Sequence, residues 1–270
     1  NGERISCSRL GARSADVKSP ATSIGSALAR YRHGVGDPTT KLSETDFWRA
    51  TLTPDGPGTV HLDWSGPALQ TQAWGPGAQW LLDRVPAITG ALDPGYVFEA
   101  GHPQVLAAQR AHPHLRLGAS HTLYHELLPT ILAQRVTAGE ALRQWSQLAY
   151  ELGEPAAGPN SQLRMPPEPG ALLAQPSWWW HRMGVELRRV SAIRQMCTHA
   201  RKLHDWASLP PNVAGEKLSL LAGIGQWTIG TVLSTALGDP DAVAVGDYHL
   251  KNVVVHALTG RARGFPGLFT

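Results

Sequence analysis

A glycine-rich turn is the part of the sequence whose residue types favour the binding of an anion. It reads Leu221-Ala222-Gly223-Ile224-Gly225, and its glycines allow positive φ or the close approach of a ligand. Apolar residues recur at helical spacing after the turn, and the run 213–221 can form a helix before it. The first N–H groups of a helix that opens at Gln226 lack helical partners, which suits a phosphate. On these residues alone, two packed helices joined by a tight turn are the simpler interpretation.

The wider string around this turn is more specific. Leu-x-Gly-Ile-Gly-x-Trp-Thr is followed about twenty residues later by Asp-Tyr-His-Leu-Lys, which begins at Asp247. This combination resembles the helix-hairpin-helix DNA glycosylase superfamily, and within it the alkylation-repair branch, the 3-methyladenine DNA glycosylase II type. Ala222 stands where members of that family usually have proline. Because alanine does not fix φ, we expect a less rigid turn.

The resemblance implies separate roles for the hairpin and for the aspartate. Asp247 is the expected catalytic residue. A fixed carboxylate stabilises the positive charge that builds on a sugar as an N-glycosidic bond breaks, and it can orient or deprotonate the attacking water. Asp247 can also cap a helix that starts at Tyr248, and the two roles are compatible. The hairpin residues expected to hold the DNA backbone are Gly223, Gly225, Gln226 and Thr228.

Trp227 occupies the hairpin position at which superfamily members that also cut the DNA backbone have a lysine nucleophile. An indole cannot form a Schiff base, so the resemblance implies a monofunctional enzyme that uses water. Lys217 and Lys251 lie nearby in the sequence but not at the matching position. We also expect Trp227 to shape the pocket for the base.

Two further segments are candidates for contact with DNA. Gln134 and Arg135 resemble the family segment that enters the duplex where the target base leaves the stack, with phosphate contact or a solvated arginine as alternatives. Trp178, Trp179 and Trp180 cannot all face one side of a helix, so at least one should be exposed or line a cavity. A tryptophan face attracts a cationic base, which makes these rings candidates for the base pocket, although core packing explains any single ring at least as well.

We expect no organic cofactor and at most a structural monovalent cation. Endonuclease III-type relatives carry a four-cysteine iron–sulfur cluster after the catalytic aspartate, but this sequence has only Cys7 and Cys197, so we expect no cluster. His121 and His125 lie four residues apart, and without a third ligand at suitable spacing a shared metal is the weaker interpretation. Relatives often hold the cation on hairpin carbonyls, which here implies those of Leu221, Gly223 and Ile224.

The composition is that of a globular protein with a mild basic excess. The 270 residues are 42% hydrophobic, enough for substantial cores, and the net charge is +3, which permits nucleic-acid binding without demonstrating it. Between Arg182 and Lys202 arginine and lysine outnumber Glu186, the one acidic residue there, and a solvated helix face is the alternative to a DNA-binding one. Two cysteines cannot form a disulfide framework, which favours a reducing, cytoplasmic location. The polar first twenty residues indicate neither a signal peptide nor a membrane span.

The hydrophobic pattern divides the chain into a tail and two regions. Residues 1–20 predict a mobile tail, residues 21–100 a small α+β domain, and residues 101–270 a helical glycosylase domain. In the α+β domain we expect a helix over 78–88 and antiparallel strands at 24–32, 47–53, 59–64 and 69–74. In the helical domain we expect a linker at 154–169 and helices over 103–111, 124–132, 138–149, 190–200 and the helix-hairpin-helix 213–237. The predicted fold class is therefore mainly α with a small N-terminal α+β domain, in the helix-hairpin-helix DNA glycosylase architecture.

Together these features predict a monofunctional DNA glycosylase that hydrolyses the N-glycosidic bond of alkylated purines, such as 3-methyladenine, in base excision repair. Its expected partner is double-stranded DNA with damaged bases, bound by a monomer that does not associate with a membrane. Two alternatives remain: a helix-hairpin-helix DNA-binding protein without catalysis, and a glycosylase for another damaged or mismatched base. Relatives usually continue with further helix after the catalytic segment, whereas this sequence stops at Thr270, which leaves open whether a wall of the pocket is missing.

Overall fold

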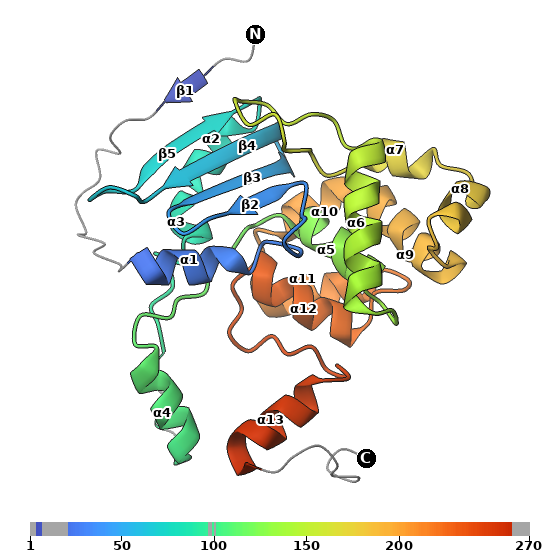
Figure 1. Ribbon diagram of the computed structural model, residues 1–270. Coiled ribbons are helices and arrows are strands. Elements are labelled where there is room, and N and C mark those ends of the chain that lie inside the picture. The colour runs from blue at the N-terminus through green and yellow to red at the C-terminus, as the bar shows by residue number, and fades with distance from the viewer. Residues whose placement is uncertain (1–3, 7–20, 97–98, 100, 261–270) are drawn as a thin grey trace.

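An antiparallel sheet lies on one side of the molecule and a group of helices on the other (Figure 1). The structure is a computed structural model that describes residues 4–6, 21–96, 99 and 101–260. Over these residues the sheet has five strands in the order β1-β5-β4-β3-β2. The strands are β1 (Arg4–Ser6), β2 (Thr40–Leu42), β3 (Asp46–Thr53), β4 (Gly56–Asp63) and β5 (Gln70–Trp74).

The helices fall into a set that covers the sheet and a larger set beside it. The covering helices are α1 (Ala21–Ala29), α2 (Ala78–Asp83) and α3 (Val85–Ile88). Two helices, α4 (Pro103–Ala111) and α13 (Leu250–Thr259), lie together at one end of the molecule (Figure 1). The remaining helices are α5 (Leu123–Leu132), α6 (Ala138–Leu152), α7 (Pro169–Leu173), α8 (Ser177–Arg182), α9 (Leu187–Thr198), α10 (Ala200–Trp206), α11 (Pro211–Ser219) and α12 (Gln226–Ala236).

Both faces of the sheet are covered, but by different parts of the chain. Phe47 of β3 lies opposite Leu62 of β4, and both are buried against α1, α2 and α3. On the other face, Ala50 packs with Leu163 and Met165 of the long loop between α6 and α7. The alternation of side chains along a strand gives each face its own partner. The loop that the sequence predicts as a linker therefore also serves as a cover for the sheet.

The predicted strands of the meander are confirmed, and two predictions before them are wrong. The segment 24–32 was expected to be a strand, but α1 occupies most of it. Ile24, Ala27, Leu28 and Tyr31 recur at helical spacing, and the last three are buried. Part of the predicted mobile tail is ordered, because β1 pairs with β5. A strand of three residues has too little pattern to be recognised in the sequence. The remaining tail residues, 1–3 and 7–20, lie outside the described residues.

The predicted helices are confirmed, with small changes at their ends and one division. The single helix expected over 78–88 is divided at Arg84 into α2 and α3, and Pro86 lies in the first turn of α3, where its missing N–H is tolerated. Pro129 lies inside α5 without ending it. Within the described residues no helix is long and apolar enough to cross a membrane.

Helix α5 is the centre of the helical group. All ten of its residues are buried, and it packs against α6, α9, α10, α12 and strand β3. Most of these residues are apolar, but two ionisable side chains, His125 and Glu126, are buried with them. A helix buried on every side must satisfy such groups with internal partners.

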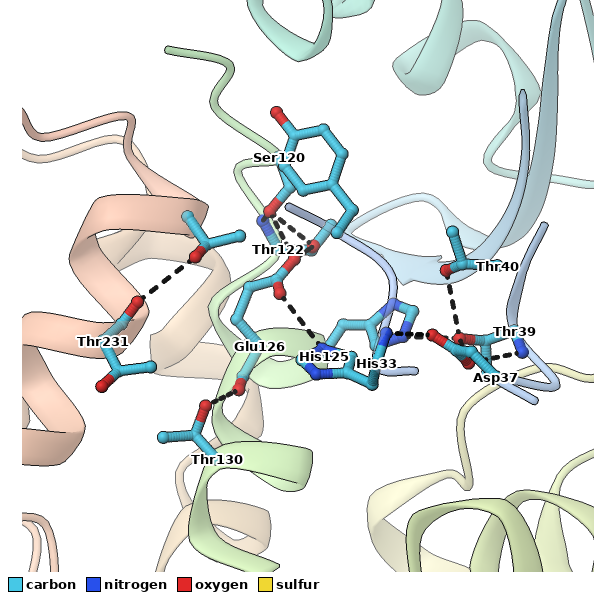
Figure 2. Close-up of polar contacts among 12 residues, drawn as sticks. His33, Asp37, Thr39, Thr40, Ser120, Thr122, His125, Glu126, Thr130 and Thr231 are labelled. Carbon is cyan, nitrogen blue, oxygen red and sulfur yellow. Dashed lines mark hydrogen bonds and ion pairs between the residues drawn. The ribbon is translucent and has the colours of Figure 1, made fainter. Parts of the chain in front are cut away.

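Glu126 is paired with an arginine from the sheet. Its carboxylate contacts the guanidinium of Arg49 on β3, and each side chain is 2% exposed. Ser120 donates a hydrogen bond to the same oxygen at 2.9 Å, and His33 lies 3.6 Å from the other oxygen (Figure 2). Burial alone would raise the pKa of Glu126, but the Arg49 charge and the His33 and Ser120 contacts outweigh it, so the pKa is lowered. The pair fixes α5 against the sheet.

His125 makes the second connection between α5 and the sheet region. Its ring nitrogens lie 2.9 Å from the hydroxyl of Thr51 and 3.1 Å from that of Thr39, and the ring is fully buried. Burial first, then the Arg49 and His33 charges, hold its pKa well below the ordinary value, so the ring is neutral. The two nitrogens are therefore used inside the protein, and over the described residues no cluster of three His, Cys, Asp or Glu side chains could hold a metal.

The buried His125 should make the stability of the fold sensitive to acid. In the folded state the ring stays neutral below its ordinary pKa of 6.5, whereas the unfolded chain binds a proton there. The free energy of unfolding should therefore be highest above pH 6.5 and fall below it, by up to about 1.4 kcal/mol per pH unit for this one proton. Urea unfolding at pH 5 to 8 measures the slope.

His125→Gln is the matched control for this pH dependence. Glutamine can form hydrogen bonds but does not titrate, so the variant should lose stability less steeply than wild type between pH 7 and 5. Glu126 remains in both proteins, and its lowered pKa removes stability only below its ordinary value of 4.5. Equal slopes in the two proteins would show that His125 does not carry the effect.

Candidate active site

The glycine turn joins two helices, as the sequence predicts. Helix α11 ends at Ser219 and α12 begins at Gln226, and the amide of Ile224 donates to the carbonyl of Leu221 at 3.0 Å. The side chains of Leu221 and Ile224 are 4% and 5% exposed and belong to the main core of the helical group. The turn is therefore fixed to the core by its two apolar side chains, while Gly223, Gly225 and Gln226 stay exposed.

Gly223 and Gly225 differ in backbone conformation and in the space available for a side chain. Gly223 has a φ of 88°, and a Cβ there would lie 2.7 Å from the Cβ of Ala192 on α9. Gly225 has ordinary extended backbone, with a φ of −98°, and a Cβ there would meet nothing within 4 Å. Only Gly223 is required by the conformation of the chain. The open space at Gly225, just before the uncapped start of α12, is where an external group can approach the backbone.

The candidate wedge residue Gln134 contacts the hairpin. Its side-chain amide donates to the carbonyl of Gly223 and to the hydroxyl of Thr228, each at 3.0 Å. Thr228 is 2% exposed, so its side chain is directed into the protein. The hydroxyl of Thr228 therefore holds Gln134, and the predicted contact of Thr228 with the DNA backbone stays a prediction that leaves its side chain aside. Arg135 follows with an exposed side chain and a φ of 58°.

Asp247 lies next to the hairpin and is held by three hydrogen bonds. The indole N–H of Trp227 donates to Oδ2 at 3.0 Å, and the amides of His249 and Leu250 donate to Oδ1 at 2.8 Å each. The two amides belong to the start of α13, so the carboxylate caps this helix as well as facing Trp227. The capping alternative is therefore observed, although the capped helix begins at Leu250 and not at Tyr248, and the carboxylate also lies beside the hairpin.

These contacts keep the Asp247 carboxylate ionised. The Trp227 hydrogen bond is the largest cause of the lowered pKa of Asp247. Partial burial, the next largest effect, opposes it, but the two backbone amides and the nearby His249 add to the lowering, so the pKa is below its ordinary value. A carboxylate with a lowered pKa is a weak base but a persistent negative charge. The arrangement therefore suits the stabilisation of positive charge better than the removal of a proton.

Gly230 positions the segment that carries Asp247. It lies in the second turn of α12, and a Cβ there would overlap the carbonyl of Val243. The backbone at Val243 and Ala244 therefore crosses α12 in direct contact, and the amide of Asp247 then donates to the carbonyl of Ala244 at 3.0 Å. A glycine inside a helix costs about 1 kcal/mol relative to alanine and often marks such a close approach. That signal was present in the sequence, although the prediction did not use it.

The tryptophans of α8 do not reach this site. Trp179 and Trp180 are 6% and 0% exposed and belong to the main core, so our prediction that they line a base pocket is corrected for both. Trp178 is 67% exposed, but α8 packs against α9 at the opposite end of the helical group from α13 (Figure 1). Three consecutive aromatic residues on a short helix must point in different directions, and two of the three directions here lead into the core.

The basic run includes one arginine with an internal role. Arg189 of α9 is 3% exposed and donates to the carbonyls of Leu132 and Gly184 and to the side chain of Gln144. It therefore holds the last carbonyl of α5, that of Leu132, and connects α9 with α6 through Gln144. From the sequence alone Arg189 belongs with the surface charges, because residue type does not distinguish a buried arginine from an exposed one on the same helix.

The expected cation site remains a prediction. Of the three hairpin carbonyls, Leu221 accepts the amide of Ile224 and Gly223 accepts the Gln134 side chain. A carbonyl oxygen has two lone pairs, so each can still coordinate an ion.

Replacing Gly230 with alanine should displace the 243–244 segment. We expect the free energy of unfolding to fall by about 1–3 kcal/mol, since a methyl group has no space beside Val243. Gly139→Ala in α6 is the control, because a Cβ there meets nothing within 4 Å and should change stability by less than about 1 kcal/mol. Chemical unfolding of both variants measures the difference, and equal values would contradict the close approach.

Replacing Trp227 with phenylalanine should raise the pKa of Asp247. The change removes the indole N–H that donates to Oδ2, which is the largest cause of the lowered pKa. Carboxyl-carbon NMR across pH 2 to 7 measures the titration directly. Trp178→Phe, at the exposed position on α8, should leave it unchanged. An Asp247 titration that is the same in all three proteins would exclude the Trp227 contact as its cause.

Comparison with known proteins gives the fold. No protein-family model matches the chain, and no curated protein matches it significantly. Among solved structures, a 3-methyladenine DNA glycosylase from Archaeoglobus fulgidus superposes with a TM-score of 0.69 at 17% identity, over 96% of this chain and 87% of that one. An 8-oxoguanine glycosylase/lyase from Clostridium acetobutylicum, in complex with double-stranded DNA, gives 0.57 at 11% identity, over 83% and 77%. The chain therefore has the fold of these DNA glycosylase structures.

Proposed function

We propose that this protein is a monofunctional DNA glycosylase that hydrolyses the N-glycosidic bond of alkylated purines in double-stranded DNA. The observation that carries the proposal is the Asp247 carboxylate, which the Trp227 indole holds at 3.0 Å beside the hairpin. The carboxylate is partly buried, and its pKa is lowered. The fold shared with DNA glycosylase structures is consistent with this activity but does not assign it.

The chemistry assigned to Asp247 is the stabilisation of an oxocarbenium-like sugar. When the bond between C1′ and the base nitrogen breaks, its electron pair leaves with the base and positive charge builds on the sugar. A carboxylate that stays ionised stabilises this charge without reorganising. Water then adds to C1′ and releases a proton to solvent or to the carboxylate. The products are the free base and an abasic site.

Alkylated purines are the substrate class that one carboxylate serves best. Alkylation of the ring weakens the glycosidic bond, so the leaving base needs little protonation by the enzyme. Trp227 supports a reaction that ends at the abasic site, because an indole has no amine for a Schiff base. Lys217 in α11 and Lys251 in α13 are both exposed on helices that flank this region.

The DNA is assigned to the hairpin and to the loop after α5. The exposed Gly225 and Gln226, at the uncapped start of α12, offer backbone N–H groups to a phosphate. Arg135 is exposed, and its neighbour Gln134 is bonded to the hairpin. We assign Arg135 to the opened base pair, where a side chain offsets part of the cost of unstacking. The remaining expectation, that Trp227 also contacts the base, belongs to the same proposal.

Base release is the direct test. Wild-type protein incubated with randomly methylated duplex DNA should release methylated purines, identified by mass spectrometry, and leave alkali-labile sites. Asp247→Asn keeps the size of the side chain and removes its charge, so the rate should fall by about 10²- to 10⁴-fold. Asp241→Asn, on an exposed residue earlier in the same segment, should retain the wild-type rate.

Other outcomes of this assay would reject the proposal in distinguishable ways. Duplex binding without release of any base would indicate a DNA-binding protein without catalysis. Release of only oxidised or mismatched bases from suitable duplexes would change the substrate class and keep the role of Asp247. A covalent protein–DNA adduct trapped by borohydride would indicate an amine nucleophile and contradict the monofunctional reaction.

A further inference from the structure

Gln134 connects two parts of the candidate site that are far apart in the sequence. It follows the end of α5, and its amide donates to the carbonyl of Gly223 in the hairpin turn and to the hydroxyl of Thr228 in the first turn of α12. A carbonyl only accepts hydrogen bonds, so the group that faces Gly223 must be the amide NH₂, whose two hydrogens are then both used. We call these two bonds the Gln134 bridge.

Helix α9 supports both ends of this bridge. Arg189 of α9 donates to the carbonyl of Leu132, at the end of α5, at 2.7 Å. Ala192, one turn further along α9, lies against Gly223. The loop and the hairpin are thus each placed by α9, and over the described residues the hydrogen bonds that join them to each other are those of Gln134. The bridge therefore adds a direct connection between the loop and the hairpin to the packing of α5 on α12.

Arg135, the next residue, is in an unfavourable conformation for its type. Its φ of 58° lies in the left-handed region, which glycine adopts without strain and a residue with a side chain does not. Its side chain is exposed, so packing does not explain why an arginine occupies this position. Strain of this kind, held by surrounding contacts, is typical of residues whose side chain is used.

We propose that Gln134 is a positioning residue, which sets the direction of Arg135 relative to the hairpin amides so that one duplex engages both. This inference rests on the proposed function, because that function assigns the hairpin to phosphate and Arg135 to the opened base pair. Both contacts must act on the same short stretch of DNA, and a loop that can rotate relative to the hairpin would seldom offer both together. Gln134 itself does not touch the reacting atoms.

The test begins with Gln134→Met, which keeps the length of the side chain, adds no charge and removes both donors. Base release is measured in a single turnover, with protein in excess over methylated duplex so that binding is saturated. We expect the rate to fall about tenfold, comparable with the loss of one or two hydrogen bonds. Gln147→Met is the control, since Gln147 is exposed on α6 and bonds only to Glu151 in the described structure, and its rate should stay within about twofold of wild type.

A double-mutant cycle separates positioning from general damage. If Gln134 acts by directing Arg135, Gln134→Met should change the rate by less than about twofold in an Arg135→Ala background. A wild-type rate for Gln134→Met, or the same tenfold loss in both backgrounds, overturns the inference. Unfolding free energies measured in parallel show whether any variant is only partly folded at the assay temperature.

The two proposals fail in different ways. If wild-type protein releases no base, the proposed function is rejected, and the Gln134 bridge is then judged from affinity for undamaged duplex across a salt series. Weaker binding by Gln134→Met that is not additive with Arg135→Ala supports positioning in a DNA-binding protein. Additive or absent effects on binding overturn it. If wild type is active and Gln134→Met equals it, only the further inference is rejected.

Discussion

The buried ion pair between Arg49 and Glu126 is the constraint from which the rest of the geometry follows. Removing two charges from water costs several kcal/mol per ion, and their attraction offsets this only when the geometry is good and the remaining polar atoms are bonded. Here Ser120 and the carbonyl of Tyr31 supply two such bonds, while Glu126 Oε2 has only His33 at 3.6 Å and Arg49 Nε has no hydrogen-bond partner among the described residues; both ionic side chains are 2% exposed. Such a pair tolerates little displacement of α5 against the sheet, because movement would leave a charge unpaired in the interior.

Helix α5 connects the ion pair at its first turn with the candidate site at its other end. The helix is buried over its whole length, so it behaves as a rigid element between the ion pair near its first turn and Gln134 just beyond its last. Arg189 fixes the carbonyl of Leu132 at that far end, and Gln134 then fixes the hairpin. Helix α12 packs on α5 from the hairpin onwards, and the segment with Asp247 lies on α12 at Gly230. The sheet, which contributes no residue to the site, therefore contributes to its geometry.

Residue type and spacing were sufficient to predict turns, strands and helices, which are local features. They did not predict which side chains are buried, because burial depends on how the helices pack. The hairpin, the three meander strands and most helices were predictable, since each has a period or a turn residue of its own. Asp247 was found through the resemblance of the hairpin and the downstream Asp-Tyr-His-Leu-Lys string to a DNA glycosylase superfamily, and its catalytic role stays a prediction. The direction of Thr228 and the burial of Trp179 and Arg189 were not, because a threonine, a tryptophan or an arginine on a helix can face either way and the neighbouring helices decide. The helix at Ala21–Ala29 is a different case, because the helical spacing of its buried residues is visible in the sequence although a strand was predicted there.

Trp227 links the two parts of the proposed mechanism in a single side chain. At the position where the resemblance implies a lysine in enzymes that also cut the backbone, an indole removes the amine and at the same time places an N–H on Asp247. A lysine there would also stabilise the ionised carboxylate, through the positive charge of its ammonium group. In its neutral form the same lysine would attack C1′ of the sugar as a nucleophile. The neutral N–H orients the carboxylate and lowers its pKa without adding a positive charge beside it. A carboxylate whose charge is not neutralised by an adjacent lysine stabilises a cationic sugar more strongly, so the lack of an amine at position 227 and the role assigned to Asp247 follow from the same residue.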